Sequence, residues 1–144
     1  MGEISWAQYQ TDRFFEGRKS PSQTQCDEIA RSVSGAAAVS PVESPGSMSY
    51  TVICKRPHED LVVSFREQEA RLEDGMVQLA RQIYGDLVPE STCYGQVQGA
   101  DPPLIIYSMP YLRGSACVEA LCYEVDMAPV DEARHIVFMR DLAR

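Results

Sequence analysis

The side chains best suited to acid–base, nucleophilic or metal chemistry in this sequence are two histidines and five cysteines. His58 lies in a polar segment, and His135 lies near the end of the chain with no thiol or acid triad nearby. The cysteines form no C-x-x-C pair, and Cys117 and Cys122 have no histidine near them, so they would supply at most two metal ligands. The sequence therefore predicts no Ser–His–Asp, Cys–His or zinc centre, and it favours reduced thiols over disulfide bonds.

One stretch, residues 46–85, contains the pattern around which the chain is organised. Segments 49–54 and 61–65 are rich in β-branched and aromatic residues, and the polar, proline-containing link between them predicts an antiparallel hairpin. The following apolar residues have helical spacing: Leu72, Met76, Leu79, Ala80 and Ile83. Gly85 and Pro89 are expected to end that helix. The order is a glycine-containing turn, a strand, a second strand that ends in Arg66, and a long helix.

The segments before this stretch predict shorter elements. We expect a helical turn capped by Thr11, and a second short helix from about Gln25 with Asp27 and Glu28 in its first turn. Gly35 is expected to close the second helix.

The remaining segments predict three strands and a final helix. An edge strand is expected at 37–42, a short strand at 93–99, and a strand buried on both faces at 104–109, where the apolar run is continuous. Residues 130–144 have a helical pattern that continues to the last residue. The predicted fold class is α+β, with an antiparallel sheet of about five strands, one long packed helix and short helices at both ends.

Composition and charge restrict the partners. The hydrophobic fraction of 44% is that of an ordinary globular chain, and the net charge of −8 disfavours nucleic acid or anionic membrane surfaces. No apolar run approaches the roughly 20 residues that span a bilayer, and the N-terminal segment lacks the basic start of a secretory signal. We therefore expect a cytoplasmic protein that binds neither nucleic acid nor membranes.

The ordered set of motifs resembles the N-terminal lobe of the aminoglycoside-phosphotransferase-like, protein-kinase-like fold. It is particularly similar to the phosphotransferase-enzyme family of filamentous fungi, in which some members accompany secondary-metabolite genes. The motifs that carry this resemblance are GSMSYTV (46–52), VVSFR (62–66), LARQIYGDLVP (79–89) and PPLIIYSMPYLRG (102–114). The final RHIVFMRDLAR resembles the helix that begins the C-terminal lobe.

The resemblance implies three segments. Residues 1–35 would be an N-terminal extension with a short helix, and residues 36–114 would be the kinase-like lobe and its hinge. Residues 115–144 would be the start of an incomplete C-terminal lobe.

The resemblance also implies a phosphate-binding region. Gly46, Ser47 and Ser49 would belong to the turn over the nucleotide phosphates, where small residues let backbone N–H groups approach an anion. A plain tight turn between two strands is the alternative. Arg66 would take the place of the strand lysine that holds the phosphates, although a guanidinium is not equivalent to an ammonium, and a surface charge is its alternative.

The expected carboxylate partner of this cation falls near Gly75, which has no side chain. Glu73 is the preferred substitute and Glu69 the second choice, and the alternative is that both simply face water.

Ser108, Met109 and Tyr111 would form the hinge, whose backbone groups bond an adenine ring. A core strand with its exit turn is the alternative, and Pro110 removes one N–H donor. The cofactor implied is weakly bound ATP, without Mg²⁺ because the metal-binding lobe is absent.

Phosphoryl transfer in this fold requires a loop with a catalytic Asp, an Asn five residues later, and a further Asp that holds Mg²⁺. The single H-x-D in the sequence ends at Asp60, Phe65 occupies the Asn position, and the loop precedes the long helix. We interpret this H-x-D as a polar turn and predict no catalytic residue.

Three hypotheses follow. The preferred one is a truncated lobe without phosphotransfer activity of its own, from a parent that phosphorylates a small-molecule hydroxyl with ATP. The second is a phosphotransferase subunit that another chain completes. The third is a non-enzymatic interaction module, accessory to a fungal secondary-metabolite pathway. In each, the uncovered face of the sheet favours a homodimer or a partner chain.

Overall fold

The computed structural model describes residues 2–114 and 128–144. The chain divides into two compact units, Met1–Tyr111 and Leu112–Arg144. Cys117, Cys122 and the helical pieces expected between residues 116 and 127 lie outside the described residues.

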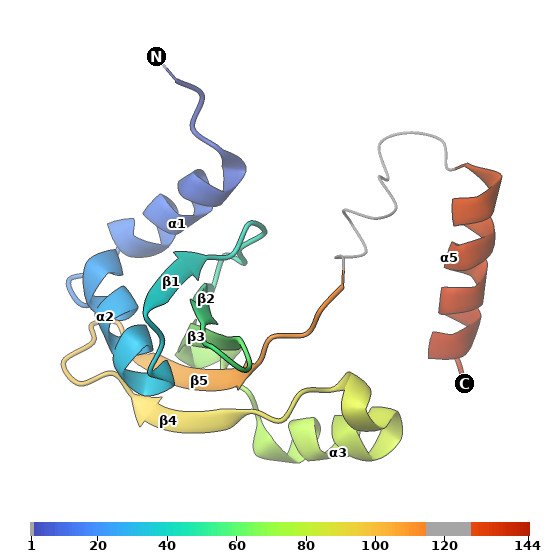
Figure 1. Cartoon of the computed structure of the whole chain (residues 1–144). Helices are drawn as coiled ribbons and strands as arrows, with labels where there is room; N and C mark the ends of the chain where they lie inside the picture. The colour runs from blue at the N-terminus through green and yellow to red at the C-terminus, as the bar shows by residue number, and fades with distance from the viewer. Residues whose placement is uncertain (1, 115–127) are drawn as a thin grey trace. The chain divides into compact units, whose positions relative to one another are not determined.

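The first unit is built on a five-stranded antiparallel sheet with the strand order β1-β2-β3-β5-β4 (Figure 1). The strands are β1 (Ala38–Pro41), β2 (Ser49–Lys55), β3 (Leu61–Glu67), β4 (Thr92–Gln96) and β5 (Leu104–Pro110). The predicted α+β class is confirmed, and every predicted strand is present, although β4 ends three residues earlier than expected. The first five residues of β5 are all buried, as its continuous apolar sequence predicts.

Two helices precede the sheet, and both begin earlier than predicted. Helix α1 (Trp6–Glu16) starts from Ser5, whose hydroxyl accepts the Gln8 N–H. The expectation that Thr11 caps a short turn is wrong, because Thr11 lies inside α1 and donates its hydroxyl to the Ala7 carbonyl. The polar sequence of α1 lacks the apolar spacing by which helices are found, so its length was missed.

Helix α2 (Gln23–Ser34) begins with a capping box. The Ser22 hydroxyl accepts the Gln25 N–H, and the Gln25 side chain accepts the Ser22 N–H. The prediction that Asp27 and Glu28 lie in the first turn is therefore wrong, because the helix starts at Gln23. Its predicted end is confirmed, since Gly35 has the left-handed φ of 69° and bonds back to the Arg31 carbonyl.

The core lies between these two helices and one face of the sheet. Aromatic rings form its centre: Tyr50 packs near Phe14, Phe15 and Phe65, with ring centroids 5.0 to 6.5 Å from its own. The Tyr50 hydroxyl donates to Asp27 Oδ1 at 2.8 Å. Burial against α1 and α2 thus makes the N-terminal segment part of the same packed body as the sheet.

The long helix predicted after β3 is present as α3 (Asp74–Tyr84), between the 3₁₀ turns η1 (Gln68–Ala70) and η2 (Gly85–Leu87). Gly85 ends it with a positive φ and a bond to the Arg81 carbonyl, as predicted. The expected packing of this helix is not found within the described residues: Leu72 lies before its start, and Met76, Leu79 and Ile83 of the apolar stripe are 63%, 49% and 63% exposed.

The second unit contains helix α5 (Pro129–Leu142), which confirms the helix predicted at the end of the chain. None of the described helices is long and apolar enough to cross a membrane.

Candidate nucleotide-binding face

The sheet face opposite the core carries most of the predicted site. Successive side chains of a strand point to opposite faces, so the residues between the core positions of β2, β3 and β5 share this face. The strand register aligns them in three rows: Ser49–Arg66–Ile105, Thr51–Ser64–Tyr107 and Ile53–Val62–Met109. We call these nine residues the second face.

The second face changes in character along the strands. One end carries Arg66 and Ser49, which lie directly opposite each other, and the far end carries the half-buried apolar row of Ile53, Val62 and Met109. Four residues along a strand separate the two ends, a distance of about 13 Å. Ser64, Ile105 and Tyr107 are buried, so most of the partly exposed residues of this face lie toward its two ends.

Arg66 lies at the end of β3, where the chain turns into η1. Its Nη1 donates to the Ala70 carbonyl at 3.2 Å, and its Nε is buried without a hydrogen-bond partner among the described residues. A buried N–H without a partner is unfavourable, but this atom is too buried for a ligand to reach, so the remaining guanidinium N–H groups are the candidate donors.

Neither predicted carboxylate forms an ion pair with Arg66 within the described chain. Glu73 lies 3.5 Å from Arg71 Nη2, with both side chains about half exposed, and Glu69 lies exposed in η1. The charge of Arg66 is therefore not neutralised by a neighbouring carboxylate of the described residues. This differs from the pairing expected between Arg66 and Glu73.

The predicted phosphate turn is divided between two places. Ser49 lies on the second face, whereas Ser47 lines a separate cavity below α1. A Cβ added at Gly46 would meet only the Ser49 hydroxyl, at an ordinary 3.6 Å, so the backbone there does not require glycine. The Glu67 N–H donates to the Met48 carbonyl at 3.0 Å and fixes the turn to the end of β3.

The predicted hinge lies at the end of β5. Strand β4 begins opposite Ser108, so the edge of β5 beyond Ser108 faces no further residue of β4. Met109, which is half-buried, lies just beyond Ser108, on the second face. The Tyr111 N–H is bonded to the Asp60 carbonyl at 3.0 Å, and because hydrogen-bonded pairs alternate along an antiparallel ladder, the backbone of Met109 faces Val62 of β3. The side chain of Met109 is therefore its candidate ligand contact.

The H-x-D segment forms the polar link between β2 and β3, as interpreted from the sequence. The Asp60 carboxylate accepts from Lys55 Nζ at 2.7 Å and from the Arg56 N–H at 3.2 Å. These bonds hold the link between β2 and β3 in a turn, so Asp60 has a structural role there.

Tyr107 was not predicted as a site residue, yet it organises the second face. Its hydroxyl accepts the Leu72 N–H at 3.1 Å and donates to the Leu72 carbonyl, which ties the segment before α3 to β5. The sequence signal for this role of Tyr107 is its place inside an apolar run, because the hydroxyl of a buried tyrosine usually finds a hydrogen-bond partner.

Comparison of the chain with protein-family models, with curated proteins and with solved structures found no match.

Proposed function

We propose that this chain is a nucleotide-binding lobe of the kinase-like phosphotransferase type, and that these 144 residues bind ATP weakly without transferring phosphate. The parent activity would be ATP-dependent phosphorylation of a small-molecule hydroxyl. The observation that carries the proposal is the second face, where Arg66 at one end pairs with no carboxylate of the described residues and the other end is the apolar row of Ile53, Val62 and Met109.

Each end of the face has a role in this proposal. Arg66 and Ser49 would hold the phosphates, and the guanidinium would supply charge-assisted hydrogen bonds, which are stronger than neutral ones. The side chains of Ile53, Val62 and Met109 would contact the adenine ring. Tyr107 would position the segment that follows Arg66.

Phosphate transfer is not expected from these residues. The H-x-D that ends at Asp60 is used to close the β2–β3 link, and the sequence contains no second H-x-D. Glu73 lies beside Arg71, so the carboxylate expected to pair with Arg66 is not in place among the described residues. Mg²⁺-dependent ATP hydrolysis by the pure chain would contradict this part of the proposal.

The test is calorimetric titration with ATP. We expect millimolar to submillimolar binding, and Arg66→Gln should weaken it about tenfold because a charge-assisted contact is lost. Arg31→Gln is the matched control, since Arg31 is an exposed helical residue outside the second face and the charge change is the same. Equal affinity of Arg66→Gln and the unaltered chain would refute the proposed site.

A second candidate function is a non-enzymatic interaction module. The observation that favours it is the uncovered stripe of α3, where Met76, Leu79 and Ile83 form a continuous apolar surface. A homodimer or a partner chain would cover that stripe. The same titration separates the two candidates, because an interaction module requires no affinity for ATP.

A further inference from the structure

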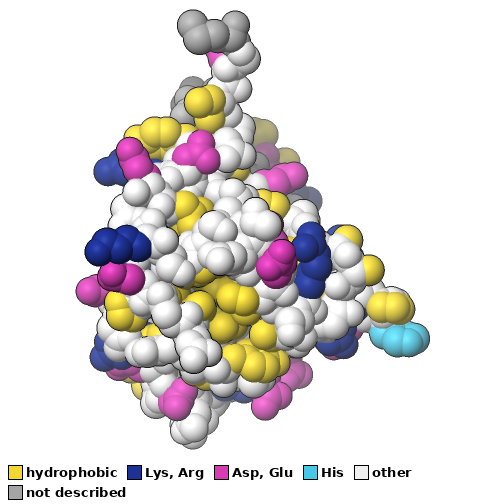
Figure 2. Space-filling view, turned by 90° about the vertical axis from the view of Figure 1, so that its left-hand side faces the viewer, with side chains coloured by type: hydrophobic (Ala, Val, Ile, Leu, Met, Phe, Trp, Pro, Cys, Tyr) yellow, Lys and Arg dark blue, Asp and Glu magenta, His cyan; other side chains and the backbone are white. Residues whose placement is uncertain are grey.

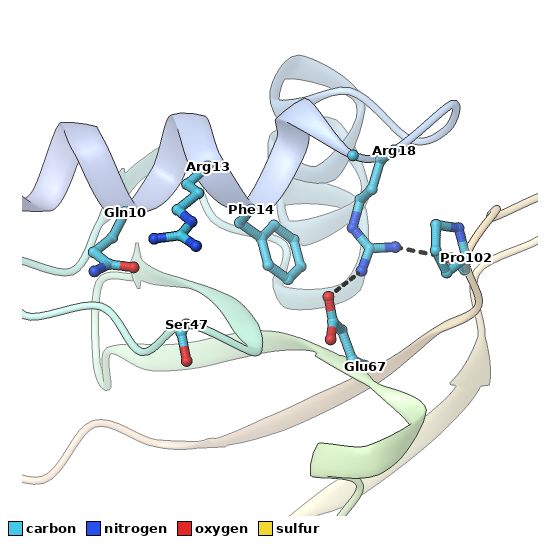
Figure 3. A pocket seen from close by; sticks show the side chains of 8 residues that line it. Gln10, Arg13, Phe14, Arg18, Ser47, Glu67 and Pro102 are labelled. Atoms are coloured by element: carbon cyan, nitrogen blue, oxygen red, sulfur yellow. Dashed lines mark hydrogen bonds and ion pairs between the residues drawn. The ribbon is translucent and has the colours of Figure 1, made fainter.

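A cavity of about 360 Å³ lies between α1 and one end of the sheet. It is bounded by the turn before β2, the end of β3 and the connection between β4 and β5. Its lining is mixed: the ring of Phe14 forms an apolar wall, and five lining residues have polar or charged side chains, namely Gln10, Arg13, Arg18, Ser47 and Glu67 (Figure 3). Its volume is within the range of small-molecule sites.

Arg18 is a fixed, buried cation of this cavity, with a side chain that is 2% exposed. Its Nη2 lies 2.9 Å from Glu67 Oε1, and its Nη1 donates to the Pro102 carbonyl at 2.8 Å. The guanidinium carbon lies 4.5 Å from the centroid of the Phe14 ring. Its Nε is buried without a partner among the described residues, so one donor of a rigid arginine is unused.

Arg13 is the second cation, and it is not neutralised. Its Nη1 contacts the Tyr9 hydroxyl at 3.4 Å, and it forms no ion pair with a carboxylate of the described residues. Figure 3 shows Gln10, Arg13 and Phe14 projecting from α1 toward the segment that carries Ser47. Most donors of the Arg13 guanidinium are therefore available to a ligand.

The positive charge of the cavity is local. Arg13 and Arg18 face a single lining carboxylate, that of Glu67, which leaves one positive charge in excess. The whole chain has a net charge of −8, and on the face seen in Figure 2 acidic and basic side chains are interspersed. An excess positive charge in a concave site attracts anions, even though the chain as a whole is acidic.

We propose that this cavity binds a small phosphate-type oxoanion, either free or as the phosphate group of a small metabolite. Arg13 supplies a forked donor that matches oxoanion geometry, and Arg18, held in place by Glu67 and the Pro102 carbonyl, adds a fixed positive charge beside it. Gln10 and Ser47 add neutral donors, and the space beside Phe14 accommodates an organic group. The site is separate from the second face, because Ser49 and Arg66 do not line it.

The test is isothermal titration calorimetry of the full chain with inorganic phosphate at constant ionic strength. Arg13→Gln should weaken phosphate binding about tenfold, because a charge-assisted bidentate contact is lost. Arg31→Gln changes the net charge equally from an exposed helical position outside the cavity, and it should change the affinity less than about twofold. Because Arg13 is exposed, its replacement should leave the thermal unfolding transition in place.

Three results would overturn the proposal. The first is no phosphate-specific binding by the unaltered chain, and the second is equal weakening by Arg13→Gln and Arg31→Gln. The third is loss of phosphate binding in Arg66→Gln but not in Arg13→Gln, which would assign the anion to the second face. A phosphorylated metabolite that binds more tightly than phosphate, with the same dependence on Arg13, would identify the organic group as part of the ligand.

Discussion

Replacement of Tyr50 by phenylalanine tests whether the N-terminal helices and the sheet form one cooperative body. Tyr50 is 1% exposed, and its hydroxyl donates to Asp27 Oδ1 at 2.8 Å and accepts from Gln23 Nε2 at 3.2 Å. Tyr50→Phe keeps the ring packing and removes both bonds between β2 and α2. The change therefore isolates the polar link between the two layers.

The expected cost follows from these contacts. A hydrogen bond to a charged acceptor contributes about 1.5–3 kcal/mol, and Asp27 is half-buried, so water replaces part of what the hydroxyl supplied. We expect the free energy of unfolding to fall by about 2 kcal/mol. At roughly 4 °C per kcal/mol for a domain of this size, the melting temperature should fall by about 8 °C.

The pH dependence gives an independent check with a definite sign. Burial, and next the hydrogen bond to Asp27, raise the pKa of Tyr50 above its ordinary value of 10.0. Above pH 10 the unfolded chain loses this proton while the folded chain keeps it, so the unaltered protein loses stability as pH rises. The difference from Tyr50→Phe should shrink by about 1.4 kcal/mol per pH unit above pH 10.

Urea unfolding followed by circular dichroism, at pH 7 and between pH 9 and 11, measures both effects. Tyr84→Phe is the control, because Tyr84 is 44% exposed and its hydroxyl bonds to no described residue. Its effect should stay below about 0.5 kcal/mol. A loss of less than about 0.5 kcal/mol in Tyr50→Phe would refute the proposed link between α2 and the sheet.

Three further substitutions test the cap of α2 and the difference in burial between Leu79 and Leu104. Ser22→Ala removes the capping box with Gln25 and should cost about 1 kcal/mol in urea unfolding; an unchanged midpoint would mean that the cap does not stabilise α2. Leu104→Ala should cost about 3 kcal/mol because Leu104 is fully buried, whereas Leu79→Ala should cost less than about 1 kcal/mol at its exposed position on α3. Equal losses for the two leucines would show that something covers the α3 stripe in solution.

The sheet could be predicted from the sequence because its signals are local. β-Branched and aromatic runs separated by polar or proline-containing links identify the strands. Gly35 and Gly85 mark the helix ends in the sequence because glycine readily adopts the positive φ that both residues have in the structure. The start of α2 could also have been found, since Ser22 and Gln25 have the spacing of a capping box. Ser5 and Gln8 have the same Ser-x-x-Gln spacing before α1, but α1 lacks an apolar stripe, and docking of Phe14 stabilises it instead.

The contacts of the candidate site depend on the path of the backbone, which sequence spacing does not fix. Spacing favoured a pair between Arg66 and Glu73, but the turn η1 brings the Ala70 carbonyl to Arg66 and leaves Glu73 beside Arg71. The pair between Arg18 and Glu67 joins residues 49 positions apart, and it forms only because α1 docks on the sheet. Such long-range pairs have no local sequence signal.

The most direct test of the central proposal is to map ATP onto the chain by amide chemical shifts of the ¹⁵N-labelled protein. We expect ATP to shift the amides around Ser49, Arg66 and Met109, at both ends of the second face, and Arg66→Gln to weaken these shifts. An absence of shifts at saturating ATP, or shifts confined to α1 and α2, would contradict it.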